Sequence, residues 1–209
     1  MKLKLFELLL ALATLSTATV YLIRHGEKNL NDSSNHNLSL RGELRSEALS
    51  RLFFPVYSKP LIEIGKIISM QQSKTYPARR ATQTAIEIAV AGNLTVEEFS
   101  QDEETVMINA TRNYSRAGTN VLIVWNHSFM TSIALKLLEL SDSEKKHSDG
   151  LVWEDTDYDR IWQVDLTRGV VTEICQRLLF GDSDCFSRVI LKVSDHIESL
   201  TQKSEYPLA

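Results

Sequence analysis

Two apolar runs that each stop at a histidine constrain the fold of this chain most strongly. Val20 to Ile23 is apolar throughout and is followed at once by Arg24 and His25. Val121 to Trp125 repeats this layout and leads, after one residue, to His127. Short runs without alternation are typical of interior strands in parallel sheets that are covered on both faces. Ligands bind at the carboxyl edge of such sheets, so both histidines are predicted to lie at a functional site.

Two segments between these runs predict helices with polar starts. Tyr76 to Ala85 is a loop that becomes a helix ending near Ala91, and Arg80 lies at its start. Leu38 to Gly42 opens a helix predicted to reach Phe54, because leucine and alanine recur at helical spacing and a proline follows. An arginine at a helix start is frequently a solvated surface residue. Arg80 therefore gains a functional interpretation only together with the histidine motifs.

The motifs together resemble one known family. Arg24-His25-Gly26-Glu27, the Arg-Ala-x-Gln-Thr-Ala segment that begins at Arg80, and the strand that precedes His127 stand in the order found in the histidine phosphatase superfamily, the phosphoglycerate mutase-like proteins. The resemblance covers about Val20 to Leu140. It implies an α/β fold, a three-layer α/β/α sandwich with a mostly parallel central sheet.

The resemblance also implies a phosphatase that needs no cofactor and no metal. His25 is the expected nucleophile, since a neutral imidazole attacks phosphorus and gives a phosphohistidine that water then hydrolyses. Arg24, Arg80 and His127 are the expected phosphate ligands, because their N–H groups stabilise the charge on the transferring oxygens. The expected partner is a small phosphorylated substrate whose identity the sequence does not reveal.

The acid that protonates the leaving oxygen is less clearly marked. Family members usually supply a Glu or Asp between the second arginine and the second histidine, and Glu103 and Glu104 hold that position, with Asp102 behind them. Asp102 fits the N-cap of a following helix equally well. Asn31 resembles, in its spacing from His25, a phosphate-binding asparagine of mutase-type members. It also lies in an Asn-x-Ser sequon, and one molecule cannot use it for both roles.

The first 18 residues differ from the rest and have the layout of a secretory signal peptide. Lys2 and Lys4 precede an apolar run from Leu8 to Leu15, and small residues end the segment at Ala18. The run is too short to cross a bilayer of about 30 Å, and an ordinary buried first helix is the alternative. We expect one domain over residues 19–209, secreted or held in the secretory-pathway lumen, without membrane attachment once the signal is removed.

The cysteines and sequons fit that compartment. Cys175 and Cys185 are expected to form a disulfide, which stabilises by roughly 2 to 3 kcal/mol in the chain-entropy model. Two free thiols in a reducing compartment are the alternative. A glycan on Asn126 would block the neighbouring histidine, so not every sequon is used. N-glycosylation sequons stand at Asn31, Asn37, Asn93, Asn109, Asn113 and Asn126.

The charge balance argues against nucleic acid as a partner. The formal net charge of −4 becomes −5 when the first 18 residues, with two lysines and one glutamate, are removed.

Three other functions stay open: a phosphoglycerate mutase-type phosphotransferase, a non-catalytic phospholigand-binding module, and a metal hydrolase built on His25, His127 and an acidic residue. The short segment from Ala91 to Asn120 and the predicted secretion argue against the mutase. The sequence leaves the oligomeric state open.

The rest of the chain completes the expected sandwich. Asp142 to Asp159 is polar, holds Trp153 and Tyr158, and is a candidate rim or lid over the pocket. The tail, with apolar residues from Val189 to Leu200 on one face, suggests an amphipathic helix packed on the sheet. Further strands are predicted at Gly65–Met70, Leu94–Phe99, Arg160–Leu166 and Val170–Gln176, the last two joined by a turn at residues 167–169, and a helix at Phe129–Leu140.

Overall fold

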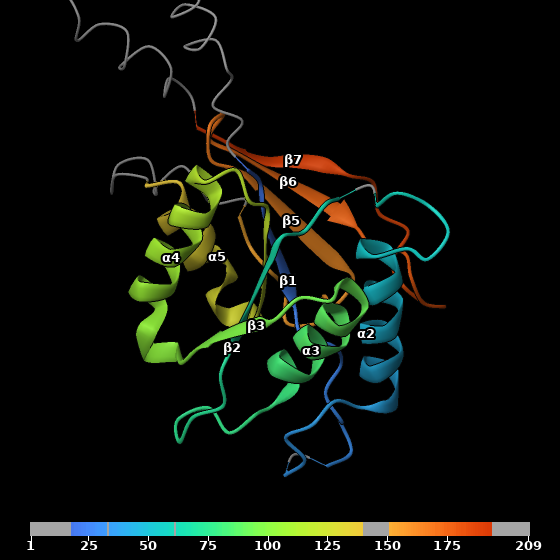
Figure 1. The fold of residues 1–209 in the computed structure, drawn as a ribbon. Helices are drawn as coiled ribbons and strands as arrows, with labels where there is room; N and C mark the ends of the chain where they lie inside the picture. The colour runs from blue at the N-terminus through green and yellow to red at the C-terminus, as the bar shows by residue number, and fades with distance from the viewer. Residues whose placement is uncertain (1–17, 33, 61, 140–150, 194–209) are drawn as a thin grey trace, which may run out of the picture.

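The structure is a computed structural model that describes residues 18–32, 34–60, 62–139 and 151–193 (Figure 1). Within these residues, seven strands form one sheet in the order β3-β2-β4-β1-β5-β6-β7. The strands are β1 (Val20–Arg24), β2 (Lys66–Met70), β3 (Val96–Phe99), β4 (Val121–Trp125), β5 (Arg160–Asp165), β6 (Val170–Cys175) and β7 (Arg188–Lys192). The helices are α2 (Leu40–Phe53), α3 (Arg80–Gly92), α4 (Glu104–Arg116) and α5 (His127–Leu137), with a 3-10 turn, η1 (Gln101–Glu103).

The sheet is mixed. Strands β3, β2, β4 and β1 are parallel neighbours, whereas β5, β6 and β7 extend the sheet by antiparallel pairing. Leu22 at the centre of β1 pairs with Ile123 of β4 on one side and with Trp162 of β5 on the other. The predicted α/β class and the predicted β5–β6 hairpin are confirmed, and the parallel pairing holds for the half of the sheet that carries the two histidine motifs.

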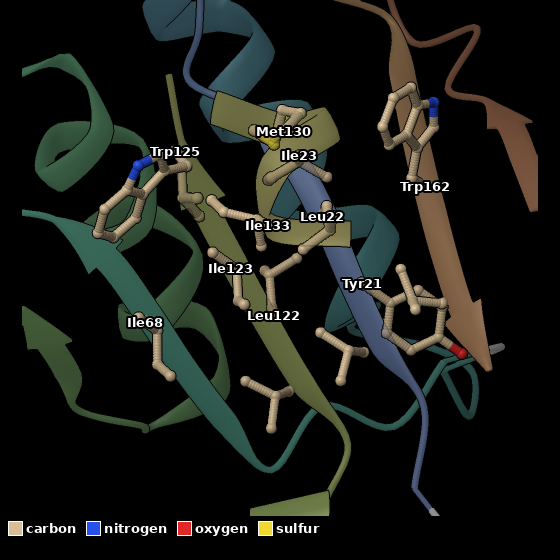
Figure 2. Packing of buried hydrophobic residues seen from close by; sticks show 14 of the residues in the cluster. Tyr21, Leu22, Ile23, Ile68, Leu122, Ile123, Trp125, Met130, Ile133 and Trp162 are labelled. Atoms are coloured by element: carbon tan, nitrogen blue, oxygen red, sulfur yellow. The ribbon is translucent and has the colours of Figure 1, made fainter. Parts of the chain in front are cut away.

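Helices cover both faces of the sheet. In Figure 1, α2 and α3 lie on one side and α4 and α5 on the other, which gives the predicted three layers. Every residue of β1 and β4 is buried, as expected of strands covered on both faces. Figure 2 shows Met130 and Ile133 of α5 packed over Leu22 and Ile23 of β1.

The chain reverses its winding direction between β1 and β4. From β1 the chain proceeds through α2 toward β2, and from β4 it proceeds through α5 toward β5 on the opposite side. The loops that leave these two adjacent strands therefore diverge, and a crevice at their carboxyl ends is where open α/β sheets bind ligands. His25 and His127 follow these two strands.

The expected C-terminal helix is partly wrong. Arg188–Lys192 is strand β7, paired antiparallel with β6, and residues 194–209 lie outside the described part of the chain. The apolar positions of this short run suit a strand as well as a helix, and the Cys175–Cys185 disulfide brings the chain back beside β6. The predicted signal peptide also lies outside the described residues, apart from Ala18, and no helix in the described part of the chain is long and apolar enough to cross a membrane.

Candidate active site

Three elements bring four of the predicted site residues to one edge of the sheet. Arg24 ends β1, and the amide of His25 still donates to the carbonyl of Trp125 at 3.2 Å, so the pairing with β4 continues to the histidine. His127 begins α5, where the side chain of Asn126 caps the helix by accepting from the Ser128 amide at 3.0 Å. Arg80 is the first residue of α3, the helix that follows β2.

Gly26 lets the turn after β1 lie directly against helix α2. A Cβ atom at this position would stand 2.6 Å from the carbonyl oxygen of Gly42, a distance that no side chain tolerates. The amide of Gly26 donates to the hydroxyl of Thr84 in α3 at 3.0 Å. The loop that carries His25 is therefore clamped between two helices, and the glycine is required by close backbone approach.

His25 is a buried, neutral imidazole. Its side chain is 2% exposed, and Nδ1 lies 2.7 Å from the carbonyl oxygen of Gly26. A carbonyl only accepts, so Nδ1 carries the proton and Nε2 keeps a free lone pair. Burial, assisted by the positive charges of Arg24 and Arg80, lowers the pKa of His25 to about 3. Nε2 is therefore available as a nucleophile throughout the physiological pH range.

Arg24, the last residue of β1, is a buried cation. It is 1% exposed, its guanidinium carbon lies 3.7 Å from the centre of the Tyr158 ring, and burial lowers its pKa against the opposing effects of Tyr158 and Asp155. Nη2 donates to the Tyr158 hydroxyl at 3.0 Å, and Nη1 donates to the backbone carbonyls of Asp155 and Asp157. Loop 151–159 is thus hydrogen-bonded directly to Arg24.

Several buried polar atoms at this edge have no hydrogen-bond partner among the described residues. Leaving a buried donor unpaired costs about 1 to 3 kcal/mol, so a cluster of such donors indicates a place for a ligand that accepts hydrogen bonds. The atoms with free donor groups are Arg24 Nε, Arg80 Nε, the Tyr76 hydroxyl, Trp125 Nε1 and the Ser69 hydroxyl. They belong to the ends of β1, β2 and β4, to the loop before α3 and to the start of α3.

A carboxylate of the protein itself, that of Asp155, lies among the positively charged side chains at this edge of the sheet. Asp155 Oδ1 is 3.0 Å from His127 Nε2, 3.3 Å from Arg24 Nη2 and 3.9 Å from Lys28 Nζ. Burial opposes its ionisation, but Lys28, His127 and Arg24 outweigh that effect and lower the pKa of Asp155. Burial and Arg24 likewise lower the pKa of His127. The pose of this carboxylate shows that the cluster accommodates an oxyanion.

The other predicted residues make their contacts elsewhere. Glu103 caps η1 by accepting from the Ser100 amide at 2.8 Å. Glu104 joins α4 to α5, with Lys136 Nζ at 2.8 Å and the Ser132 hydroxyl at 3.1 Å. Asn31 is exposed, and its backbone amide donates to the Asn29 side chain. Among the described contacts, none joins these three residues to Arg24, His25, Arg80 or His127.

Asp155 and Tyr158 were not predicted as site residues. The sequence marks residues 142–159 as a rim or lid, and this interpretation agrees with the contacts of residues 155–158, although residues 140–150 lie outside the described chain. The individual residues could not be chosen, because an irregular segment has no periodicity that assigns a side chain to one face.

A second charged network supports the loop after β1. Arg45 of α2 is buried and donates to both Glu27 and Asp182, each at 2.7 Å from Nη2, and Arg41 Nη2 reaches Asp182 at 2.9 Å. Burial lowers the pKa of Arg45, but Asp182 and Glu27 outweigh it, so that pKa is raised. Asp182 lies in the loop closed by the Cys175–Cys185 disulfide. The disulfide loop is therefore connected to the residue next to Gly26.

Comparison with known proteins gives distant structural likenesses. No protein-family model and no curated protein sequence matches this chain. A mycobacterial glucosyl-3-phosphoglycerate phosphatase has a TM-score of 0.48 at 12% identity, over 70% of this chain and 89% of its own. A phosphoglycerate mutase from Plasmodium falciparum has a TM-score of 0.48 at 12% identity, over 81% and 98%. A protein histidine phosphatase, SixA, in complex with tungstate has a TM-score of 0.43 at 18% identity, over 69% and 86%.

These TM-scores lie below 0.5, so the case for a function depends on the geometry of the site itself. The described part of the chain brings together two histidines, two arginines and one aspartate at the crevice where the sheet changes its winding direction. It holds no group of three side chains arranged to bind a metal ion.

Proposed function

We propose that this protein is a phosphomonoester hydrolase of the histidine phosphatase type, which works without a metal through a phosphohistidine on His25. One observation carries the proposal: the imidazole is buried and neutral, its Nδ1 is held by the Gly26 carbonyl so that Nε2 keeps its lone pair, and Arg24, Arg80 and His127 lie near enough to lower its pKa. A ligand that accepts several hydrogen bonds and carries negative charge fits that surrounding. A phosphoryl group has both properties and is open to attack by nitrogen.

The arginines supply electrostatic stabilisation. Charge in phosphoryl transfer is spread over the three non-bridging oxygens, and catalysis depends mainly on positioning and on preorganised donors. Arg24 is held by Tyr158 and by backbone carbonyls, so its orientation is fixed before a substrate arrives. Arg80 Nη1 makes a weak contact, 3.4 Å to the carbonyl of Asn35, and among the described residues its Nε has no partner. We assign both side chains to the non-bridging oxygens.

The proposed compartment is oxidising. The Cys175–Cys185 disulfide supports the predicted secretion, since disulfides persist mainly in secreted proteins and in the secretory pathway. Secretion, the signal peptide and glycosylation are proposals. Their combined test is expression in a eukaryotic secretory system, followed by the intact mass of the protein from the medium, with and without glycosidase.

The experiment that tests the activity is hydrolysis of p-nitrophenyl phosphate by the purified protein in the presence of a chelator. His25→Ala is expected to abolish turnover, whereas His36→Ala, which removes an exposed imidazole, is expected to retain it. Acid-labile phosphate on His25, detected by mass spectrometry after rapid quenching at alkaline pH, identifies the intermediate. Turnover in His25→Ala, or turnover abolished by the chelator, contradicts the proposal.

A phospholigand-binding module is the second candidate, and the position of Asp155 favours it. A site whose arginine and histidine already hold a carboxylate is an anion site whether or not chemistry follows. Binding of inorganic phosphate by titration calorimetry, together with no turnover and no phosphohistidine, would assign this function instead.

A further inference from the structure

We propose that Asp155 is the general acid that protonates the leaving oxygen and the general base that activates water in the second step. The inference rests on the proposed function. An alcohol leaves phosphorus as an alkoxide unless a proton is supplied, so a hydrolase of alkyl phosphomonoesters needs an acid within hydrogen-bond reach of the ester oxygen. Asp155 is the carboxylate that contacts the phosphate-binding cluster in the described part of the chain.

Its distances place it directly at the proposed phosphate site. Asp155 Oδ1 lies 3.0 Å from His127 Nε2 and 3.3 Å from Arg24 Nη2. A phosphoryl oxygen that binds these same two donors would occupy the space of the carboxylate and displace it to an adjacent position. Because the Asp155 side chain is 66% exposed, a rotation of that side chain toward solvent is enough to admit the substrate. The displaced carboxyl then stands on the open side of the phosphoryl group, where the leaving group departs.

The backbone around Asp155 is anchored on both sides, so the displaced carboxyl stays near the site. Trp153 is buried against Trp162, with ring centres 4.9 Å apart, and its indole N–H donates to the carbonyl of Asp157 at 2.9 Å. On the other side, the Asp159 carboxylate accepts from Arg160 at 2.7 Å and from the Ser183 amide at 2.6 Å. Asp155 lies in the short turn between these anchors, closed by the Asp157 amide donating to the Glu154 carbonyl.

Substrate binding changes the protonation of this group in the required direction. In the free protein, Arg24, His127 and Lys28 stabilise the carboxylate. A bound phosphoryl dianion neutralises those cations and adds negative charge beside Asp155, and both effects favour the protonated carboxyl. The proton is therefore taken up when the substrate is bound, and the exposed side chain can receive it from water.

The two chemical steps then balance. The His25 Nε2 lone pair forms the N–P bond while the P–O ester bond breaks. The electron pair of the ester bond goes to the leaving oxygen, which takes the proton of Asp155 and departs as an alcohol. In the second step the Asp155 carboxylate takes a proton from water as the water oxygen bonds to phosphorus. The P–N bond breaks, its electron pair returns to Nε2, and inorganic phosphate leaves.

The other nearby carboxylates are committed to different partners. Glu27 is held by Arg41 and Arg45, and Glu104 is held by Lys136. Asp157 turns its carbonyl toward Arg24 while its carboxylate faces Arg160, 3.9 Å from Nε. None of these three carboxylates contacts His127 in the described structure.

The test is the dependence of rate on the leaving group. Asp155→Asn is compared with the wild type on an alkyl substrate, glycerol 1-phosphate, and on p-nitrophenyl phosphate, whose leaving group needs little protonation. Glu154→Gln is the matched control, because it removes one negative charge from the same exposed segment. Glu104→Gln tests the acid suggested by the sequence. Asp155→Asn is expected to lower kcat/KM, which reports the first step, on glycerol 1-phosphate by roughly 10²- to 10⁴-fold, the typical contribution of a general acid, and to change kcat/KM on p-nitrophenyl phosphate little.

On p-nitrophenyl phosphate the expected result for Asp155→Asn is a burst. The first step stays fast, one equivalent of p-nitrophenol per enzyme is released, and phosphohistidine accumulates because the second step lacks its base. A role confined to structure would slow both substrates equally and give no burst, and that result overturns the proposal. A higher kcat/KM on both substrates also overturns it, since Asp155 would then only obstruct the phosphate site. If Glu104→Gln instead lowers kcat/KM much more on glycerol 1-phosphate than on p-nitrophenyl phosphate, the general acid is Glu104.

Failure of this inference and failure of the proposed function give different results. Turnover in His25→Ala contradicts the phosphohistidine route whatever Asp155 does. If the wild type forms phosphohistidine but Asp155→Asn changes kcat/KM equally on both substrates, the phosphohistidine route stands and Asp155 is rejected as its acid. An unchanged melting temperature of Asp155→Asn, expected for an exposed side chain, shows that the comparison concerns folded protein.

Discussion

Replacement of Asp182 by alanine tests whether the charged network beside the site holds the fold together. The Asp182 carboxylate is 4% exposed and accepts five hydrogen bonds, two from Arg45, one from Arg41 and two from the amides of Leu178 and Leu179. Without it, the buried guanidinium of Arg45 retains Glu27 and Gln176 as partners. The buried positive charge is then only partly compensated.

The expected loss follows from that count. Removing one partner of a buried ion pair costs about 3 to 5 kcal/mol. Because Glu27 still pairs with Arg45, we expect the free energy of unfolding to fall by about 3 kcal/mol, the lower end of that range. A domain of this size loses roughly 2 to 4 °C in melting temperature per kcal/mol. Asp182→Ala should therefore melt about 6 to 12 °C below the wild type, as measured by calorimetry at neutral pH. Urea unfolding followed by circular dichroism measures the change in the free energy of unfolding.

The matched control lies two residues away in the same loop. Asp184 is 96% exposed and, within the described part of the chain, pairs only with Arg177 at 3.3 Å, so Asp184→Ala should change the free energy of unfolding by less than about 0.5 kcal/mol. The difference should also depend on pH. Arg45 and the two amides outweigh burial and lower the pKa of Asp182, so its stabilisation is present above its unfolded pKa of about 3.9 and is lost as pH falls through the folded value. Equal melting temperatures for the two variants would refute the assignment.

Three further results are expected. Gly26→Ala should destabilise the protein by about 2 kcal/mol or more and abolish activity, because its Cβ would lie 2.6 Å from the Gly42 carbonyl; wild-type melting and turnover would contradict this. Cys175→Ser with Cys185→Ser should lower the free energy of unfolding by roughly 2 to 3 kcal/mol relative to the oxidised wild type, and the reduced wild type should match the double variant. Burial lowers the pKa of His25 to about 3, so the pH–rate profile on p-nitrophenyl phosphate should show no acid limb near pH 6.5 from this group, and a fall in rate there with the midpoint of a free imidazole would contradict this.

The strands that carry the site could be predicted because burial on both faces requires a continuous apolar run without alternation. Val121–Trp125 was predicted with its observed bounds, and β1 exceeds its prediction by one residue. Helices were less well placed at their ends: α5 begins at His127, two residues before the predicted start, because Asn126 caps it. Asn126 was interpreted as part of a sequon, although asparagine is also a preferred N-cap residue.

The carboxylate of the site could not be predicted, for a physical reason. Position in the chain suggested Glu103 and Glu104, yet a carboxylate at a helix start has strong local uses, and the structure shows both: Glu103 caps η1 and Glu104 pairs with Lys136. Asp155 approaches His127 because Trp153 is anchored to β5 and Asp159 to the disulfide loop. Those long-range contacts leave no trace in local sequence.

The same buried environment that makes His25 a nucleophile also creates the need for the rest of the site. Burial keeps the imidazole neutral, but it also makes an unpaired anion beside it costly. Arg24 is nearly as buried and is held by carbonyls of loop 151–159, so a positive charge is fixed in the same space before any substrate binds. Loss of that loop contact should therefore impair phosphate binding even with His25 intact. Tyr158→Phe, which removes one acceptor of Arg24 but keeps the stacked ring, should raise KM more than it lowers kcat, whereas an unchanged KM would mean that the loop only covers the site.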